Sequence, residues 1–443
     1  MIHHSKLARA AAILAVAGLG LAACSSGSSS SQTTSSASSA SSAGSASSAS
    51  SAAPAGTSGG TATGATYTWW DPYPQHEADS DWAKRVEACG TGAGVKIQRT
   101  AYDTSALTNQ ALLAGQEGTS PDVILLDNPA VSTLADAGIL ETMEDFGLDT
   151  SSINQNLLAA GVLDDKTYGI PIGANTLALY YNKTVLDAAG VDPTTIKDWA
   201  SLDAALKKVT ATGKGGMTFS AIGTEEGSFQ FLPWFWGAGA DLKQLDSPQA
   251  VAALTQWTDW VNNKEAPNSV ISNSQNTSWE EFLTGNFAFA ENGTWQVNSA
   301  AKADFPTGVI QLPGQSGGVA PTPTGGEFIT VPAQKDTSRY DVTKKIVECM
   351  TTTDGLVETA NTFAYYIPPT KAGQEALLAQ KPELKTWVDA VNSAKGRTSD
   401  NLGTDYPKIS EALWTAVQSA LSGAATPEAA LQAAQAQAAQ ATG

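Results

Sequence analysis

The sequence predicts an α/β fold that ends in a mostly helical segment. Three observations support this prediction. Short apolar strand patterns such as DVILL (122–126) alternate with helical patterns, the alternation resumes after Lys183, and the chain from Glu375 onward is mostly helical in pattern. Apolar strands separated by helices are typical of βαβ units with a largely parallel sheet. The length of 443 residues is enough for two domains or more.

The first part of the predicted fold has three strands, each followed by a helix. The strands are predicted at 65–70 (ATYTWW), 95–100 (VKIQRT) and 122–126, and the helices at 76–88, 105–118 and 129–138. Gly138 suits the end of the third helix, because glycine adopts at no steric cost the left-handed backbone that closes a helix.

The same alternation predicts the elements that follow. Residues 177–181 are predicted as a buried strand, and Asn182-Lys183 as the start of the next helix. Asp198 suits the cap of a further helix, because its short acidic side chain accepts hydrogen bonds from free backbone N–H groups there. Another long helix is predicted at 249–264.

The N-terminus has the features of a lipoprotein signal. Lys6 and Arg9 precede an apolar run, too short for a membrane span, that ends in LAAC (21–24). LAAC resembles the lipobox of bacterial lipoproteins, in which the cysteine is lipidated. Residues 1–23 are therefore expected to be a signal peptide and Cys24 the lipidated residue; an ordinary secretory signal with an incidental cysteine is the alternative. Residues 24–65, rich in Ser, Ala, Gly and Thr, are expected to form a disordered tether.

The net charge of −18 argues against nucleic acid as a partner, because binding to nucleic acid needs a basic face that releases counterions. The acidic balance is compatible with a soluble extracytoplasmic protein. Apart from Cys24, the chain has Cys89 and Cys349. They either form a disulfide, which the extracytoplasmic setting permits, or remain two separate buried thiols, and the sequence favours neither.

Motif searches find no convincing catalytic apparatus. G-x-S-x-G occurs at 56–60, in the tether, and at 314–318, in a Gly/Pro-rich loop, while His76 is the only histidine after the signal segment. The sequence has no H-E-x-x-H, no paired C-x-x-C and no P-loop, so no metal or cofactor is expected. Glu225-Glu226 and Glu280-Glu281 are acid pairs of the kind that a glycosidase needs. The second pair is expected to start a helix, where acidic side chains favour the helix dipole.

Tryptophan is unusually frequent, with twelve residues. A site that combines aromatic faces with a few polar groups suits a small ligand such as a sugar, whose C–H face packs on an indole while its hydroxyls take hydrogen bonds. Several aromatic residues lie where strands are predicted to end or turns to begin, and for these a ligand site and core packing are equal alternatives: Trp69-Trp70, Trp234, Trp236, Trp295 and Tyr365-Tyr366. Three others at helical spacing are expected to be core: Trp257, Trp260 and Trp414.

Six segments, in this order and spacing, resemble the extracellular solute-binding proteins of ABC importers, in particular the sugar-binding group that includes maltose-binding protein. They are 119–143 (TSPDVILLDNPAVSTLADAGILETM), 168–193 (YGIPIGANTLALYYNKTVLDAAGVDP), 231–242 (FLPWFWGAGADL), 282–295 (FLTGNFAFAENGTW), 324–332 (TGGEFITVP) and 422–435 (SGAATPEAALQAAQ). The resemblance implies a two-lobe, periplasmic-binding-protein-like fold whose discontinuous lobes are joined by a hinge. The first lobe would comprise 66–172 plus 320–365, and the second lobe 173–319 plus 366–443. The chain would cross between them near 172–175, 318–326 and 365–369.

The resemblance also implies a set of ligand-binding residues in the cleft between the lobes. They are Trp69, Trp70, Asp71, Tyr73, Asp127, Asn128, Asn175, Phe229, Gln230, Trp234, Trp236, Trp295, Gly326, Glu327 and Tyr366. Asn175 stands where the maltose-binding relative has an acidic contact, and no Asp-Arg pair follows the third strand. These departures put maltodextrin in doubt as the ligand, but not a sugar in general, and Glu327 is placed to supply the missing acid.

The function implied by the resemblance is a carbohydrate receptor on the extracytoplasmic face of the bacterial cell membrane. It would bind a mono- or oligosaccharide, bury it by hinge closure and deliver it to the permease subunits of an ABC importer. We expect a monomer that contacts the membrane only through its N-terminal lipid and is not an enzyme. The alternatives are a receptor for another small solute, such as a polyol or a glycerol phosphodiester, a surface glycoside hydrolase, and a cell-wall adhesin without a small ligand.

Overall fold

The computed structural model describes residues 64–362, 366–400 and 402–442. The predicted signal peptide, the lipidation site Cys24 and the tether up to residue 63 lie outside the described residues. Within the described ranges, no helix is long and apolar enough to cross a membrane. Two large sheets organise these residues, and we call the part built on the five-stranded sheet the first lobe and the part built on the four-stranded sheet the second lobe.

The sheet of the first lobe has the strand order β2-β1-β3-β11-β6. The strands are β1 (Thr66–Asp71), β2 (Lys96–Ala101), β3 (Val123–Asp127), β6 (Ile170–Pro171) and β11 (Glu327–Thr330). β2 and β3 pair in parallel with β1, whereas β11 runs antiparallel between β3 and β6. The last residue of β3, Asp127, therefore lies opposite the first residue of β11, Glu327. A separate two-stranded ribbon consists of β4 (Val162–Leu163) and β5 (Lys166–Thr167).

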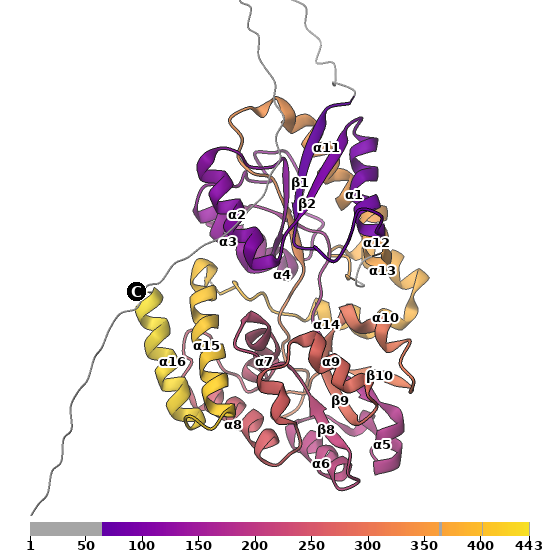
Figure 1. The fold of residues 1–443 in the computed structure, drawn as a ribbon, viewed down its shortest axis with the longest axis vertical. Coiled ribbons are helices and arrows are strands. Elements are labelled where there is room, and N and C mark those ends of the chain that lie inside the picture. Colours follow the sequence, from indigo (N-terminus) through magenta and orange to yellow (C-terminus); the bar gives the residue numbers. More distant parts are fainter. Residues whose placement is uncertain (1–63, 363–365, 401, 443) are drawn as a thin grey trace, which may run out of the picture. The chain divides into compact units, whose positions relative to one another are not determined.

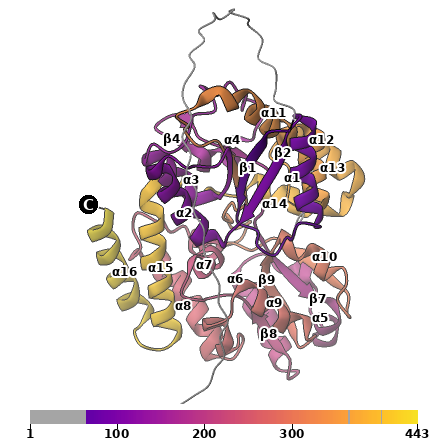
Figure 2. The same cartoon turned by 45° about the horizontal axis from the view of Figure 1, so that its top comes forward.

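Helices cover both faces of this sheet. The helices of the first lobe are α1 (Asp81–Gly92), α2 (Thr104–Glu117), α3 (Asn128–Asp136), α4 (Gln155–Leu158), α11 (Tyr340–Thr351) and α12 (Thr353–Thr362). Because strand side chains alternate, Val123 and Leu125 pack with α1 and α11, while Ile124 and Leu126 pack with α2 and α3. Figures 1 and 2 show α1, α11 and α12 on one side of β1 and β2, with α2 and α3 on the other.

The first helix begins later than the sequence predicts. α1 starts at Asp81 instead of His76, because the Ser80 hydroxyl accepts a hydrogen bond from the N–H of Ala83 and caps the helix there. On the same face, a disulfide joins α1 to α11 through Cys89 and Cys349, whose Cα atoms are 5.6 Å apart. Of the two alternatives that the sequence left open, a disulfide or two separate thiols, the structure has the disulfide.

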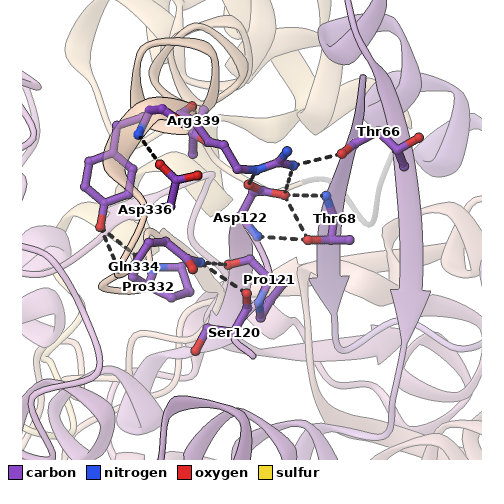
Figure 3. A network of polar contacts seen from close by, with 12 residues as sticks. Thr66, Thr68, Ser120, Pro121, Asp122, Pro332, Gln334, Asp336 and Arg339 are labelled. Carbon is purple, nitrogen blue, oxygen red and sulfur yellow. Dashed lines mark hydrogen bonds and ion pairs between the residues drawn. The ribbon is translucent and has the colours of Figure 1, made fainter. Parts of the chain in front are cut away.

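An ion pair at the amino end of β3 holds the returning chain against the sheet (Figure 3). The Arg339 guanidinium donates to both carboxylate oxygens of Asp122, at 2.6 and 2.8 Å, and to the Thr66 carbonyl at 2.8 Å. The backbone N–H and hydroxyl of Thr68 also donate to Asp122. Since Asp122 precedes β3 and Asp127 ends it, this network lies at the end of the strand away from Asp127.

The sheet of the second lobe has the strand order β10-β7-β9-β8. The strands are β7 (Leu177–Asn182), β8 (Gly215–Thr218), β9 (Phe287–Gly293) and β10 (Thr307–Ile310). β7 is antiparallel to β9 and β10, while β8 is parallel to β9. As predicted, a helix follows the buried strand: α5 (Lys183–Ala189) starts directly after Asn182, whose side chain accepts a hydrogen bond from the N–H of Val185 at 3.2 Å.

The remaining helices are α6 (Trp199–Thr210), α7 (Glu225–Gly237), α8 (Pro248–Asn262), α9 (Gln275–Leu283), α10 (Val297–Ala300), α13 (Lys371–Gln380), α14 (Lys385–Asn392), α15 (Tyr406–Leu421) and α16 (Pro427–Thr442). α15 and α16 lie side by side and pack against α7 and α8 (Figures 1 and 2). Trp257 and Trp260 are fully buried, which confirms that they are core, whereas Trp414 is half-buried.

Two local predictions in the second lobe are wrong. Glu280-Glu281 lies near the carboxyl end of α9, because Ser274 caps this helix and α9 starts at Gln275, five residues before Glu280. The aromatic segment FLPWFWG does not end a strand, because it forms the second half of α7. Pro233 lies inside that helix and ten consecutive residues of it are buried, so the segment lacks the polar face by which most helices are recognised.

Three chain segments pair side by side where the two lobes meet. Ala174 pairs with Ile367 through two N–H···O=C bonds of 2.8 Å, and Asn175 pairs with Gly325 through bonds of 3.1 and 2.9 Å. These pairs fall within the segments where the chain was predicted to cross between the lobes. The residue boundaries given for the two lobes remain a prediction. The pairing brings Asn175 and Gly325 next to the start of β11 and therefore next to Glu327.

Candidate ligand-binding site

A cavity of about 820 Å³ is lined by residues of both lobes, a size within the usual range for small-molecule sites. The first lobe contributes parts of α2 and α3 and the facing ends of β3 and β11. The second lobe contributes the amino ends of α7 and α9 and the loop after β9. The lining has five carboxyl groups and one basic side chain, Arg397: the acids are Asp103, Asp127, Glu225, Glu226 and Glu327.

Arg397 connects the acidic groups of the two lobes. Its side chain is only 3% exposed, and it donates from Nη2 to Asp127 Oδ1 at 3.2 Å and from Nη1 to Glu225 Oε1 at 2.7 Å. Its Nε donates to the Thr324 carbonyl at 3.2 Å, and its guanidinium lies 5.0 Å from the centre of the Phe229 ring. Burial alone would lower the pKa of Arg397, but the charges of Asp127 and Glu225 raise this pKa above its ordinary value. A fully charged guanidinium therefore bridges β3 of the first lobe and α7 of the second.

Glu225 is held by three donors. Besides Arg397, the Tyr406 hydroxyl donates to Oε1 at 2.6 Å and the Ser410 hydroxyl donates to Oε2. Burial, followed by the Glu225 charge, raises the pKa of Tyr406 well above its ordinary value, so this tyrosine stays a neutral donor. Glu225 also begins α7, where an acidic side chain is favoured by the helix dipole.

The proton affinity of Glu327 is altered by its surroundings in the cavity. Burial, followed by the charge of Asp127 on the neighbouring strand, raises the pKa of Glu327 to about 7. Hydrogen bonds from Tyr366, at 2.6 Å, and from Tyr73 lower this pKa, as does the charge of Arg397, but these effects offset the rise only in part. At neutral pH this carboxyl group is therefore divided between its neutral and charged forms.

Phe229 and Trp295 supply the aromatic surface of the cavity. Their ring centres are 6.4 Å apart and their planes are inclined at 48°. Phe229 is almost fully buried on α7, whereas Trp295 is half-buried. Gly293 sets the position of the indole, because a Cβ atom at residue 293 would lie 2.0 Å from a ring carbon of Trp295. An exposed indole face next to several hydrogen-bonding groups is suited to a hydroxylated ring.

The family model for bacterial extracellular solute-binding proteins matches residues 84–386 of this chain. The chain belongs to this family. Maltodextrin-binding protein MdxE of Bacillus subtilis (strain 168) is 26% identical to this solute-binding protein over 333 residues, which are 71% of this chain and 75% of that protein. A maltooligosaccharide ABC transporter solute-binding lipoprotein of Streptococcus pneumoniae (strain ATCC BAA-255 / R6) is 24% identical over 232 residues, 50% of this chain and 53% of that protein.

Solved structures confirm the predicted fold class. The cyclic alpha-maltosyl-1,6-maltose binding protein from Arthrobacter globiformis matches this solute-binding protein with a TM-score of 0.72 and 25% sequence identity, over 85% of this chain and 98% of that one. The two-lobe, periplasmic-binding-protein-like α/β fold is therefore the fold of this protein. The family and these relatives are binding proteins, not enzymes.

Six of the predicted ligand-binding residues line the cavity of this solute-binding protein. They are Asp127, Asn175, Phe229, Trp295, Gly326 and Glu327. Asn175 is 8% exposed. A Cβ atom added to Gly325 would lie only 2.1 Å from the side-chain oxygen of Asn175. Gly325 is therefore needed for the close approach of the crossing segments at the cavity.

Three other predicted residues, at the end of β1, do not line the cavity, although the Tyr73 hydroxyl reaches Glu327: they are Trp69, Asp71 and Tyr73. Asp71 is fully buried and accepts hydrogen bonds from the indole N–H groups of Trp69 and Trp82, at 2.9 and 3.1 Å. Arg99 pairs with both oxygens of Asp71, and the backbone N–H of Tyr73 donates to it at 3.2 Å. A buried carboxylate needs such partners, so this cluster stabilises the first lobe and does not line the cavity.

Three predicted residues on α7 are also placed in the protein interior. The indole N–H of Trp234 donates to the fully buried Glu291 at 2.7 Å, and the Gln230 amide donates to the Glu291 backbone carbonyl at 3.3 Å. Trp236 is 6% exposed, with the Lys395 ammonium 5.2 Å from its ring centre. The helical period separates these side chains from Phe229, which is the residue of α7's aromatic segment that faces the cavity.

The last three predicted residues lie beside the cavity without lining it. Trp70 is half-buried and packs edge-on against Tyr102, with ring centres 5.2 Å apart. Asn128 is buried, and its amide donates to the Thr324 carbonyl at 3.4 Å. Tyr366 is buried behind Glu327, to which it donates. It acts on the cavity through that carboxyl group.

Sequence reasoning missed several polar residues of the cavity, above all Arg397. It is one of only five arginines in the chain, and each of the four in the described residues forms an ion pair. Arg397 is the one whose partners line the cavity. Asp103 and Gln275 were also missed, although the position of Asp103 shortly after the second predicted strand was a usable signal, and Glu226 was considered only as part of an acid pair.

The acid pairs considered for glycoside hydrolysis have other roles in the structure. Glu225 is paired with Arg397, as described, and the backbone N–H of Gln275 donates to Glu226 at 2.8 Å. Glu281 accepts hydrogen bonds from Thr218 and Ser269, at 2.9 and 2.6 Å, and does not line the cavity. Among the described residues, no group of His, Cys, Asp and Glu side chains is arranged to hold a metal ion.

Proposed function

We propose that this protein is the extracytoplasmic receptor of an ABC importer and that it binds a carbohydrate in the cavity between its lobes. The observation that carries this proposal is the half-exposed indole of Trp295 beside carboxyl, amide and guanidinium groups from both lobes. Sugar rings present C–H groups to an aromatic face and hydroxyls to such polar groups. The printed names of the B. subtilis, S. pneumoniae and A. globiformis relatives refer to maltose-type carbohydrates, which supports the same ligand class.

The charge of the cavity favours a neutral ligand. Five carboxyl groups line it, and its one cation, Arg397, already contacts two of them. A phosphodiester would be repelled by the unpaired acids, which makes a glycerol phosphodiester the weaker alternative. A polyol carries the same hydroxyl chemistry as a sugar but lacks the flat C–H face that an indole stacks against, so Trp295 favours the sugar.

The location and partners complete the proposal. We infer that the mature chain is lipidated at Cys24, stands on the outer face of the bacterial cell membrane on the tether of 24–65, and meets the permease subunits as a monomer. The lipobox sequence LAAC and the lipoprotein name of the S. pneumoniae relative support lipidation. Metabolic labelling with a fatty acid tests it: the wild-type chain is expected to be labelled and the Cys24→Ala chain is not.

A thermal-shift screen over several dozen sugars, polyols and glycerol phosphodiesters tests the ligand class. A ligand that binds only the folded protein raises the melting temperature of the protein, by an amount that grows with the ratio of the ligand concentration to Kd. We expect carbohydrates to give the largest shifts and calorimetry to confirm them. If polyols or phosphodiesters give the shifts and no carbohydrate does, the proposed ligand class is wrong. Turnover of a glycan that disappears in the Glu225→Gln variant would contradict a receptor.

A further inference from the structure

A second hollow shares Trp295 with the ligand cavity. It has a volume of about 550 Å³ and is lined by the end of α9, by α10 and by the turn that follows α10. Trp295 is the residue that lines both this hollow and the 820 Å³ cavity. One half-buried indole therefore borders two adjacent spaces, and a ligand longer than one ring can contact both.

Three of the polar side chains that line this hollow have no polar partner within the described residues. Asn298, Lys302 and Asp304 line it and are exposed, and within the described residues their side chains make no hydrogen bond or ion pair. In contrast, Ser299 accepts a hydrogen bond from the Trp279 indole at 2.8 Å. An amide, an ammonium group and a carboxylate together offer donors and acceptors for several hydroxyls.

The backbone that carries these side chains is fixed on both sides of the indole. Gly293 packs under Trp295, and the Tyr180 hydroxyl donates to the Gly293 carbonyl at 2.9 Å. The Trp279–Ser299 hydrogen bond connects α9 to α10. The turn after α10, which carries Lys302 and Asp304, is held to the helix by the N–H of Lys302, which donates to the Ser299 carbonyl at 3.0 Å, and by the N–H of Ala303, which donates to the Ala300 carbonyl at 3.2 Å. Binding there would therefore cost little additional ordering of the backbone.

We propose that Asn298, Lys302 and Asp304 form a second carbohydrate subsite, and that the natural ligand is an oligosaccharide whose chain passes over Trp295. This inference rests on the proposed function and goes beyond it by setting the length of the ligand. One positive and one negative group in the hollow suit an uncharged, hydroxylated unit. A monosaccharide would fill part of the first cavity and leave the second hollow empty.

The test compares oligosaccharides of increasing length. The first series consists of linear α-1,4-glucans from the dimer upward. The second series consists of the oligosaccharide that binds most tightly in the screen, together with shortened forms of it. Calorimetry on the wild-type protein is expected to show affinity that rises with length and then levels off. In the N298A/K302A/D304A variant, we expect the gain from the longer members to fall several-fold while the affinity for the shortest binding member is unchanged. Lys208→Ala, an exposed lysine on α6, is the matched control and should behave as wild type.

The outcomes separate the two proposals. If a carbohydrate binds but affinity does not depend on length, or if the triple variant retains the whole gain with length, the second subsite is wrong and the proposed function stands. If no carbohydrate binds the wild-type protein, both proposals fail. Because the three substituted side chains are exposed and without partners in the described structure, the variant is expected to keep the wild-type melting temperature, which a thermal scan checks.

Discussion

Trp295 is the single residue on which ligand affinity should depend most. Replacing it with alanine removes the stacking surface of the cavity, so we expect carbohydrate binding to weaken by about 1–3 kcal/mol, as for other aromatic anchors. Calorimetry with the best ligand of the screen measures this change. Trp70→Ala is the matched control, because Trp70 is also half-buried but does not line the cavity. Equal affinity of the Trp295→Ala variant and wild type would remove this indole from the site.

Glu327 makes the stability of the ligand-free protein depend on pH. Its pKa is raised from 4.5 to about 7 in the fold, so the folded state binds more protons than the unfolded state within that window. The stability that comes from this group is fully present below pH 4.5 and is lost as the pH rises toward about 7. We therefore expect the melting temperature of wild type to fall more steeply across this window than that of Glu327→Gln.

The comparison with Glu327→Gln isolates this residue. The variant keeps an oxygen that accepts from Tyr366 but cannot ionise, while Asp127, Arg397, Tyr366 and Tyr73 still face the position. Groups elsewhere whose pKa also changes in the fold, such as His76, whose pKa is lowered by burial, contribute equally to both proteins. If the melting temperatures of the two proteins change with pH in parallel, the pKa of Glu327 is not raised in the fold.

The sequence showed which residue types a ligand site needs more clearly than it showed which of those residues line the cavity. Trp69 and Asp71 were expected in the site because they end a strand, but no local pattern shows that an indole turns inward to a buried carboxylate. Arg397 was missed because it lies in a Gly/Ser-rich segment without periodicity, and its partners are 270 and 172 residues away in sequence. Glu327, in contrast, was found because its family segment includes the crossing next to the cavity.

At the level of elements, the disulfide between α1 and α11 should stabilise the first lobe without affecting the ligand. It closes a sequence separation of 260 residues, so its loss frees a large amount of chain entropy in the unfolded state. We expect the Cys89→Ala/Cys349→Ala variant to lose about 2–5 kcal/mol of unfolding free energy, measured by denaturant titration. Its carbohydrate affinity should match wild type, because neither helix lines the cavity. A loss of affinity with unchanged stability would contradict this assignment.

The elements themselves were largely predictable because burial leaves a local signal. β3 is buried on both faces and appears as an unbroken apolar run, and Asp198 and Asn182 cap helices where their side chains indicate. α7 was not recognised, since Pro233 and a nearly continuous buried surface hide its period. The pairing of Asn175 with Gly325 is invisible locally, because it joins segments 150 residues apart whose register depends on the whole fold.

For the whole molecule, the position of Arg397 suggests how the two lobes are held together without ligand. Its guanidinium contacts Asp127 of the first lobe and Glu225 of the second, and it is almost fully buried. If it is replaced by methionine, the two carboxylates lose the cation that joins them and their like charges repel. We expect the ligand-free Arg397→Met protein to have a larger radius of gyration in small-angle X-ray scattering than the ligand-free wild type, and a larger decrease on adding ligand.

Arg339→Met separates this effect from a general loss of stability. Arg339 is also paired with a carboxylate, Asp122, but both lie within the first lobe. Removing one partner of a buried ion pair costs about 3–5 kcal/mol, the cost expected for Arg397→Met. The Arg339 side chain is 35% exposed, so Arg339→Met should cost less, but both variants should melt at lower temperature than wild type. Only Arg397→Met should change the radius of gyration, because only its partners belong to different lobes. If the two variants scatter alike, the charge bridge stabilises the fold but does not hold the lobes together, and opening of the cavity would depend on the crossing segments alone.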